Sequence, residues 1–195
     1  QNIDFIQGDL LDIESLDRKF DLIEVVGVLH HMEDPFNGWK TLTRCMNDNA
    51  LMLVGLYSDR ARQHISKIRE RIKDLKLQSN FENIVEFRKD LLKNSNTKWN
   101  DIKTSPDFYT VSGVRDLLFH VQECRFTIHK IREHLNRLEL IFLGFEDKLV
   151  KEKFKQVYNN NYDLYDLDKW ETFELKNPRI FAGMYQFWCM KSKKK

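Results

Sequence analysis

Two adjacent histidines, His30 and His31, stand where the sequence changes from an apolar run to a polar loop. The run before them, residues 22–26, is short and rich in β-branched residues, which is typical of a buried strand. Gly27 follows this run and permits a close approach of the backbone to a neighbour. Histidine exchanges a proton near neutral pH, so one of the pair could contact a ligand or act as a general base. The alternative is that both side chains only orient their own loop through hydrogen bonds.

Two further runs with strand character end in residues that could bind a ligand. Asp9 follows one such run near the start of the sequence, and Tyr57 follows another. Ligands of open α/β sheets bind at the carboxyl ends of parallel strands, so we expect Asp9, Gly27 and Tyr57 to converge on one site. Asp9 equally suits a turn, because aspartate bonds to nearby backbone N–H groups, and Asp12 could fill either role.

The hydrophobic pattern predicts the elements that position these residues. Strand-like and helical runs alternate from residue 3 to residue 57, which is typical of a parallel sheet with covering helices. From residue 59 to residue 125 the pattern is helical. This insert follows the carboxyl end of a strand, so we expect it to act as a lid or substrate platform. Beyond it, Thr127 is predicted to cap a helix. The pattern then predicts a strand at residues 140–145, a helical region at 147–175 and a last strand at 181–190.

Two helices of the insert have defined faces. The third, capped by Ser112, is predicted to place Asp116, His120 and Glu123 on one polar stripe. This stripe could bind substrate or activate a nucleophile, or it could be a solvated surface. The first helix carries an apolar stripe formed by Ala61, Ile65, Ile68, Ile72 and Leu75.

Residues 20–35, with the motifs Leu-His-His and Asp-Pro, resemble the fourth strand and following loop of class I S-adenosylmethionine-dependent methyltransferases. Residues 3–11 are similar to the third strand of that family, and residues 51–58 to its fifth. Residues 108–109 and 115–123 resemble a subgroup often fused to tetratricopeptide repeats. The resemblance implies methyl transfer from S-adenosylmethionine. It also implies a three-layer α/β fold with a Rossmann-like sheet, in which the last strand is antiparallel and inserted beside the penultimate one.

The resemblance assigns roles to individual residues. In the family, the acidic residue after the third strand binds the adenine amino group. These motifs do not specify the methyl acceptor, for which a small molecule, a protein side chain and RNA all remain candidates. The candidate residues are Asp9, Leu10, Val26 and Gly27 for the cofactor, His30 and His31 for catalysis, and Tyr57, Asp116 and His120 for the acceptor.

Two features of the family have no counterpart in this sequence. The glycine-rich loop after the first strand is missing, since the seven glycines never fall two residues apart. The acidic end of the second strand is missing too. We therefore expect a carboxyl-terminal part of a methyltransferase, truncated before the third strand. Residues 1–190 would form the partial domain, with residues 59–125 as its insert and residues 191–195 as a basic tail. The alternative is a non-catalytic fragment or interaction module.

Composition favours no large charged partner. The net charge is only +2, although residues 60–103 hold twelve Lys or Arg against six Asp or Glu, a net of +6. That segment could attract RNA or an acidic protein, but a solvated helical surface is the favoured interpretation. No apolar run reaches the roughly 20 residues of a membrane span. The three cysteines lack metal-ligand spacing and suit a reducing compartment, so we expect a cytoplasmic protein without a metal. The oligomeric state is not readable from the sequence.

Overall fold

The computed structural model describes residues 3–93, 100–119 and 123–192. The chain divides into two compact units. The sheet unit comprises Gln1–Asp59 and Cys124–Lys195, and the helical unit comprises Arg60–Glu123. No helix within the described ranges combines the length and apolar character that crossing a membrane requires.

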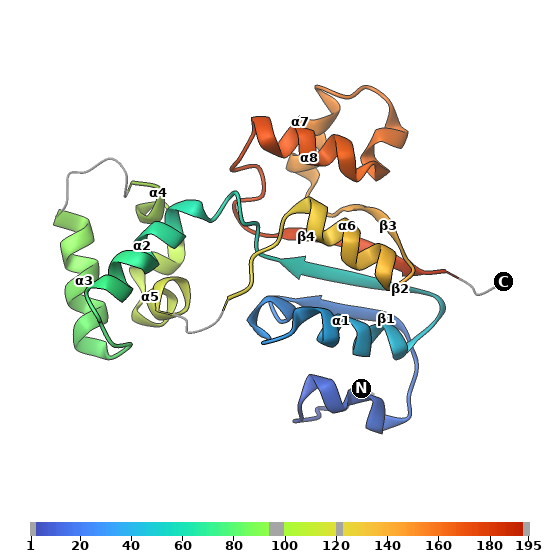
Figure 1. Ribbon diagram of the computed structural model, residues 1–195, viewed down its shortest axis with the longest axis horizontal. Coiled ribbons are helices and arrows are strands. Elements are labelled where there is room, and N and C mark those ends of the chain that lie inside the picture. Colours follow the sequence, from blue (N-terminus) through green and yellow to red (C-terminus); the bar gives the residue numbers. More distant parts are fainter. Residues whose placement is uncertain (1–2, 94–99, 120–122, 193–195) are drawn as a thin grey trace. The chain divides into compact units, whose positions relative to one another are not determined.

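A four-stranded sheet forms the centre of the sheet unit (Figure 1). Its strands are β1 (Phe20–Val26), β2 (Met46–Leu56), β3 (Leu140–Phe145) and β4 (Tyr185–Lys191), in the order β1-β2-β4-β3. β1 and β2 are parallel and are connected through α1 (Pro35–Arg44), whereas β4 is antiparallel to both β2 and β3. The predicted α/β sheet is confirmed, including its antiparallel last strand inserted beside the preceding one.

Helices bury one face of this sheet. α1, α6 (Ile128–Arg137), α7 (Lys148–Lys155) and α8 (Leu167–Lys176) share one apolar core with the strands. In β2 every second residue from Ala50 to Leu56 is buried, as the two-residue period of a strand requires. The largest fully buried side chains of this core are aromatic: Trp39, Phe154, Trp170, Tyr185 and Phe187.

The opposite face of the sheet carries an apolar row that stays partly exposed. Leu22, Leu51, Met190 and Ile141 pair side by side across all four strands. Leu22 is 52% exposed, Leu51 37% and Ile141 45%, so no helix of the described residues buries this row. The helices of the sheet unit therefore pack against one face, and the third layer of the predicted arrangement is not seen among the described residues. We call these four residues the open row.

The start of the chain departs from the predicted strand. Residues 3–9 form no strand, and Phe5 is 94% exposed. A strand needs a neighbour to satisfy its backbone groups, and the alternating apolar pattern of these residues cannot supply one. The 3-10 helix η1 (Leu10–Leu16) follows and packs against α1.

The helical unit has its own apolar core. Ile65, Ile68 and Ile72 of α2 are buried in it, which confirms most of the predicted stripe. Leu75 is 53% exposed because α2 ends one residue before it. The helices of this unit are α2 (Gln63–Asp74), α3 (Phe81–Lys93), α4 (Asn100–Lys103) and α5 (Val111–Leu118). This unit also holds the 3-10 helix η4 (Pro106–Tyr109), whereas the 3-10 helices η2 (Leu29–His31) and η5 (Asn161–Tyr165) belong to the sheet unit.

Helix capping was predicted with mixed success. Thr127 caps α6 as predicted, with its hydroxyl accepting from the Lys130 N–H at 3.2 Å. α5 is capped by Thr110 instead of Ser112, since the Thr110 hydroxyl accepts from the Gly113 N–H at 3.0 Å. The helix therefore begins two residues earlier than the sequence indicated, and Ser112 lies inside its first turn.

The predicted domain boundary at residue 190 lies within the last strand of the sheet. Lys191 is the last residue of β4, and its ammonium group donates to the Met46 carbonyl at 2.9 Å. Residues 193–195 of the predicted basic tail lie outside the described residues. The domain limits at residues 1 and 190 stay a prediction.

Candidate functional site

The loop after β1 is held at both of its ends. Gly27 has a φ of 79°, in the left-handed region that glycine adopts without strain. A Cβ atom there would meet only the Met184 Cε, at 3.9 Å, so the backbone angle demands glycine while the space beside it stays open. At the far end, an Asp34 carboxylate oxygen accepts from the Asn37 N–H at 3.1 Å and caps α1, with Pro35 in the first turn.

Three rings meet at the carboxyl ends of β1 and β2. The His30 ring centroid lies 3.9 Å from that of Tyr57 and 4.3 Å from that of His31. The His31 and Tyr57 centroids are 6.0 Å apart. The structure thus brings these three predicted site residues together, as expected for the ends of neighbouring parallel strands.

The two histidines differ in access. His30 is fully buried, whereas His31 and Tyr57 are half-buried. A general base must reach the proton that it removes, so His31 is the better placed of the pair for chemistry. His30 is better placed to orient the loop and the Tyr57 ring.

A second chain segment is bonded along this cluster. The Cys124 N–H donates to the His30 carbonyl at 2.7 Å, and the Phe126 N–H donates to the Tyr57 carbonyl at 2.9 Å. The Asp59 N–H in turn donates to the Phe126 carbonyl at 2.8 Å. The residues that lead out of β2 and those that lead into α6 therefore hold the His30 loop and the end of β2 together.

A buried carboxylate lies next to this region, and the sequence analysis missed it. Glu174 of α8 is fully buried, and one of its oxygens accepts from the Ser58 hydroxyl at 2.8 Å and from the Tyr185 hydroxyl at 2.5 Å. Glu174 stands four residues after Trp170 and one after Phe173, on the apolar face of its helix. A carboxylate at such a core-facing position was the signal that could have revealed it.

The cofactor residues predicted near the start of the chain occupy a different setting. A carboxylate oxygen of Asp9 accepts from the Leu11 N–H at 2.9 Å and caps η1, which is the turn-forming role foreseen as the alternative. Leu10 is half-buried and packs against the core. Val26, at the end of β1, is 37% exposed. Binding of a cofactor by Asp9 stays a prediction.

The comparisons with known proteins bear on the fold. No family model matches the chain. PKMT2 from Rickettsia typhi has a solved structure that superposes with a TM-score of 0.65 at 17% sequence identity, covering 96% of this chain and 39% of that protein. The structure of the same protein in complex with AdoHcy gives a TM-score of 0.61 at 16% identity, covering 96% and 40%. This chain thus shares its α/β fold with PKMT2.

A curated relative is about twice as long as the part of it that this chain matches. The uncharacterized protein syc1184_c of Synechococcus sp. (strain ATCC 27144 / PCC 6301 / SAUG 1402/1) is 26% identical over 192 residues, covering 91% of this chain and 46% of that protein. The chain thus spans about half the length of the curated relative that it matches. In this α/β fold, the cluster of His30, His31 and Tyr57 lies where open α/β sheets bind their ligands.

The predicted polar stripe of the insert is wrong in one member. Asp116 is exposed on α5, and His120 lies outside the described residues. Glu123 does not belong to this helix, because α5 ends at Leu118. Its carboxylate is instead buried between the guanidinium groups of Arg62 and Arg69, with N–O distances of 3.0 Å to each. Two cations of the basic segment are therefore engaged inside the helical unit.

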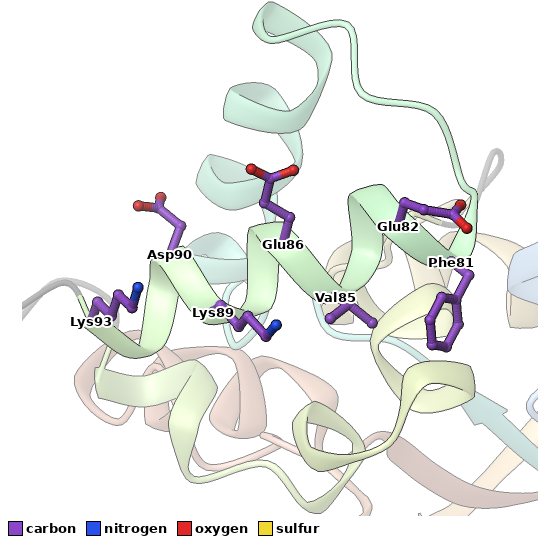
Figure 2. Close-up of a pocket in the computed structure, with 7 residues that line it drawn as sticks. All are labelled: Phe81, Glu82, Val85, Glu86, Lys89, Asp90 and Lys93. Carbon is purple, nitrogen blue, oxygen red and sulfur yellow. The ribbon is translucent and has the colours of Figure 1, made fainter.

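An open depression with a volume of about 650 Å³ lies along α3. Figure 2 shows the side chains that line it. All of its lining residues come from this one helix, and both acidic and basic side chains are among them. An active site generally brings groups from several elements together around a reacting atom. The depression therefore has the character of a charged helix surface. Its lining residues are Phe81, Glu82, Val85, Glu86, Lys89, Asp90 and Lys93.

Proposed function

We propose that this chain takes part in S-adenosylmethionine-dependent methyl transfer, and that the ends of β1 and β2 form one wall of the cofactor and acceptor site. The observation that carries the proposal is the clustering of His30, His31 and Tyr57 at two parallel strand ends in a methyltransferase-like fold. AdoHcy is the product that remains when S-adenosylmethionine has given up its methyl group, and PKMT2 has been solved in complex with it.

The residues of this wall are compatible with such a ligand. The space beside Gly27 is open enough for backbone approach, since a Cβ there would meet a single atom at 3.9 Å. On this proposal the backbone of Val26 and Gly27 lines the cofactor. The Asp9 carboxylate and the Leu10 N–H contact the adenine, which needs one acceptor and one donor.

When bound, S-adenosylmethionine supplies an activated methyl group that is displaced in line from its sulfur. This chain's part is to hold the nucleophile about 3 Å from the methyl carbon. His31 takes the proton from an acceptor that must lose one, because it is the more accessible histidine. Buried His30 keeps the loop and Tyr57 in place, and Tyr57 contacts the acceptor. Acceptor binding by Asp116 and His120 of the insert stays a prediction.

The proposal extends to the domain and its setting. Residues 1–190 act as part of a methyltransferase domain, and residues 59–125 act as a lid or substrate platform. The three cysteines are free, which favours the reducing cytoplasm. The acceptor is a small molecule or a protein side chain, since the paired arginines of the helical unit leave less of its positive charge for RNA.

Calorimetric titration of the 195-residue chain with S-adenosylmethionine and with S-adenosylhomocysteine tests the proposal. We expect micromolar binding of both ligands. Gly27→Val should weaken it at least about tenfold, or about 1.4 kcal/mol, because a β-branched residue strains a positive φ and closes the open space. Gly183→Ala is the matched control, as its Cβ would meet no atom within 4 Å. Equal affinities of the two variants would contradict the assignment of Gly27.

A second candidate function is that of a non-catalytic interaction module. The open row favours it, because four apolar side chains that pair across a whole sheet form a surface suited to a partner. The lack of any Gly-x-Gly loop in the sequence points the same way. Failure of the wild-type chain to bind either ligand in the titration would favour this candidate over methyl transfer.

A further inference from the structure

The carboxylate of Glu174 joins two segments that are far apart in the sequence. Ser58, just beyond β2, and Glu174, in α8, are separated by 116 residues, yet their side chains hydrogen-bond at 2.8 Å. Tyr185, at the start of β4, donates to the same carboxylate oxygen at 2.5 Å. All three residues are fully buried.

Packing alone does not account for an acidic residue at this place. Taking a carboxylate out of water is costly, and an apolar side chain of similar volume would fill the core at a lower cost. Two hydroxyl donors on one oxygen offset part of that cost and fix the positions of both donors. The arrangement therefore specifies geometry more than it adds stability.

Ser58 is the residue next to Tyr57, so the position of one constrains the other. The Tyr57 carbonyl, which joins Tyr57 to Ser58, accepts from the Phe126 N–H at 2.9 Å. Ser58 itself is tied to Glu174 by its side-chain hydroxyl. With its backbone held in this way, Tyr57 presents its ring 3.9 Å from the ring of His30.

We propose that Glu174 is a positioning residue, which holds Ser58 at the end of β2 and thereby keeps the Tyr57 ring against His30. The role of Tyr57 and His30 in catalysis rests on the function proposed above, but the positioning itself does not. It predicts that loss of the Ser58 hydrogen bond releases the Tyr57 ring, whereas loss of the Tyr185 hydrogen bond to the same oxygen does not.

Nuclear magnetic resonance of the histidine ring protons tests this prediction in the 195-residue chain. A tyrosine ring this close shifts the His30 ring signals away from those of a solvated histidine, and His30→Gln assigns them. In Ser58→Ala and in Glu174→Leu we expect the His30 signals to move toward those of exposed His129. In Glu174→Gln, whose amide oxygen still accepts hydrogen bonds, we expect them to stay in place.

Tyr185→Phe is the matched control, because it removes one hydroxyl donor from the same carboxylate oxygen and leaves Ser58 bonded. Unmoved His30 signals in Ser58→Ala, or the same displacement in Tyr185→Phe as in Ser58→Ala, would overturn the proposal and leave Glu174 a structural residue. Ser58→Ala decides the question by itself if Glu174→Leu does not fold. S-adenosylhomocysteine binding is measured in parallel. A wild-type chain that binds no ligand would contradict the proposed function, whereas the His30 ring signals would still test the positioning role of Glu174.

Discussion

The ends of β1 and β2 and the segment around Asp9 carry similar local patterns, an apolar alternating run followed by a polar residue, yet they fold differently. The run before His30 pairs with β2 along its length. The run before Asp9 forms no strand, and its side chains stay largely exposed. The difference shows that an alternating apolar pattern forms a strand only where a neighbouring strand can hydrogen-bond to its backbone groups.

The largest effect expected from this comparison concerns two glycines. A Cβ at Gly55 would lie 2.7 Å from the Val26 Cγ1 and 3.0 Å from the Val26 Cα, whereas a Cβ at Gly8 would meet nothing within 4 Å. We expect Gly55→Val to lower the free energy of unfolding by about 3 kcal/mol, because it forces β1 and β2 apart. Gly8→Val should change it by less than about 0.5 kcal/mol. Urea denaturation followed by circular dichroism measures both, and similar losses would show that the first segment is packed after all.

A binding measurement decides whether the segment around Asp9 belongs to the site. If the Asp9 carboxylate contacts the adenine, Asp9→Asn should weaken S-adenosylhomocysteine binding about tenfold, or about 1.4 kcal/mol. Asp12→Asn is the control, since Asp12 is the other acidic residue that could fill the role. A greater loss in Asp12→Asn would transfer the role to Asp12, and unchanged affinity in both would separate this segment from the site.

Two aspartate caps offer a smaller contrast. Asp34 caps the ten-residue helix α1, which buries Trp39 and Leu42 in the core. Asp9 caps the short η1, in which no residue is buried. We expect Asp34→Ala to lower the free energy of unfolding by about 1 kcal/mol, and Asp9→Ala to lower it by only a few tenths of that amount. Thermal unfolding of the two variants would contradict the comparison if Asp9→Ala had the larger effect.

The smallest expected effect is a pH dependence of the free energy of unfolding, caused by a histidine near the buried face of the sheet. Burial lowers the pKa of His134, which packs against the rings of Phe36, Trp39 and Phe126. The folded chain then binds fewer protons than the unfolded chain, so this contribution to stability is complete above about pH 6.5 and decreases as the pH falls below it.

Unfolding midpoints measured between about pH 5.5 and pH 7.5 check this prediction. His134→Gln should flatten the dependence, whereas His129→Gln, at an exposed position of the same helix, should leave it unchanged. A slope that persists in His134→Gln would assign the effect to another group.

Much of the architecture could be predicted because its signals are local. The strand at residues 140–145 and the Thr127 cap were read from a few neighbouring residues. The meeting of His30, His31 and Tyr57 could also be predicted, since parallel strand ends share an edge. The open row could not, because whether a helix covers a sheet face depends on where distant segments pack.

The sequence by itself determined which segments became helices or strands wherever periodicity, caps and glycine act within one or two turns. Only the tertiary structure decided which charged residues became buried: Glu123 between Arg62 and Arg69, and Glu174 with Ser58 and Tyr185. The physical reason is that a carboxylate can be buried only where hydrogen-bond donors surround it. For Glu174 those donors come from residues as far as 116 positions away.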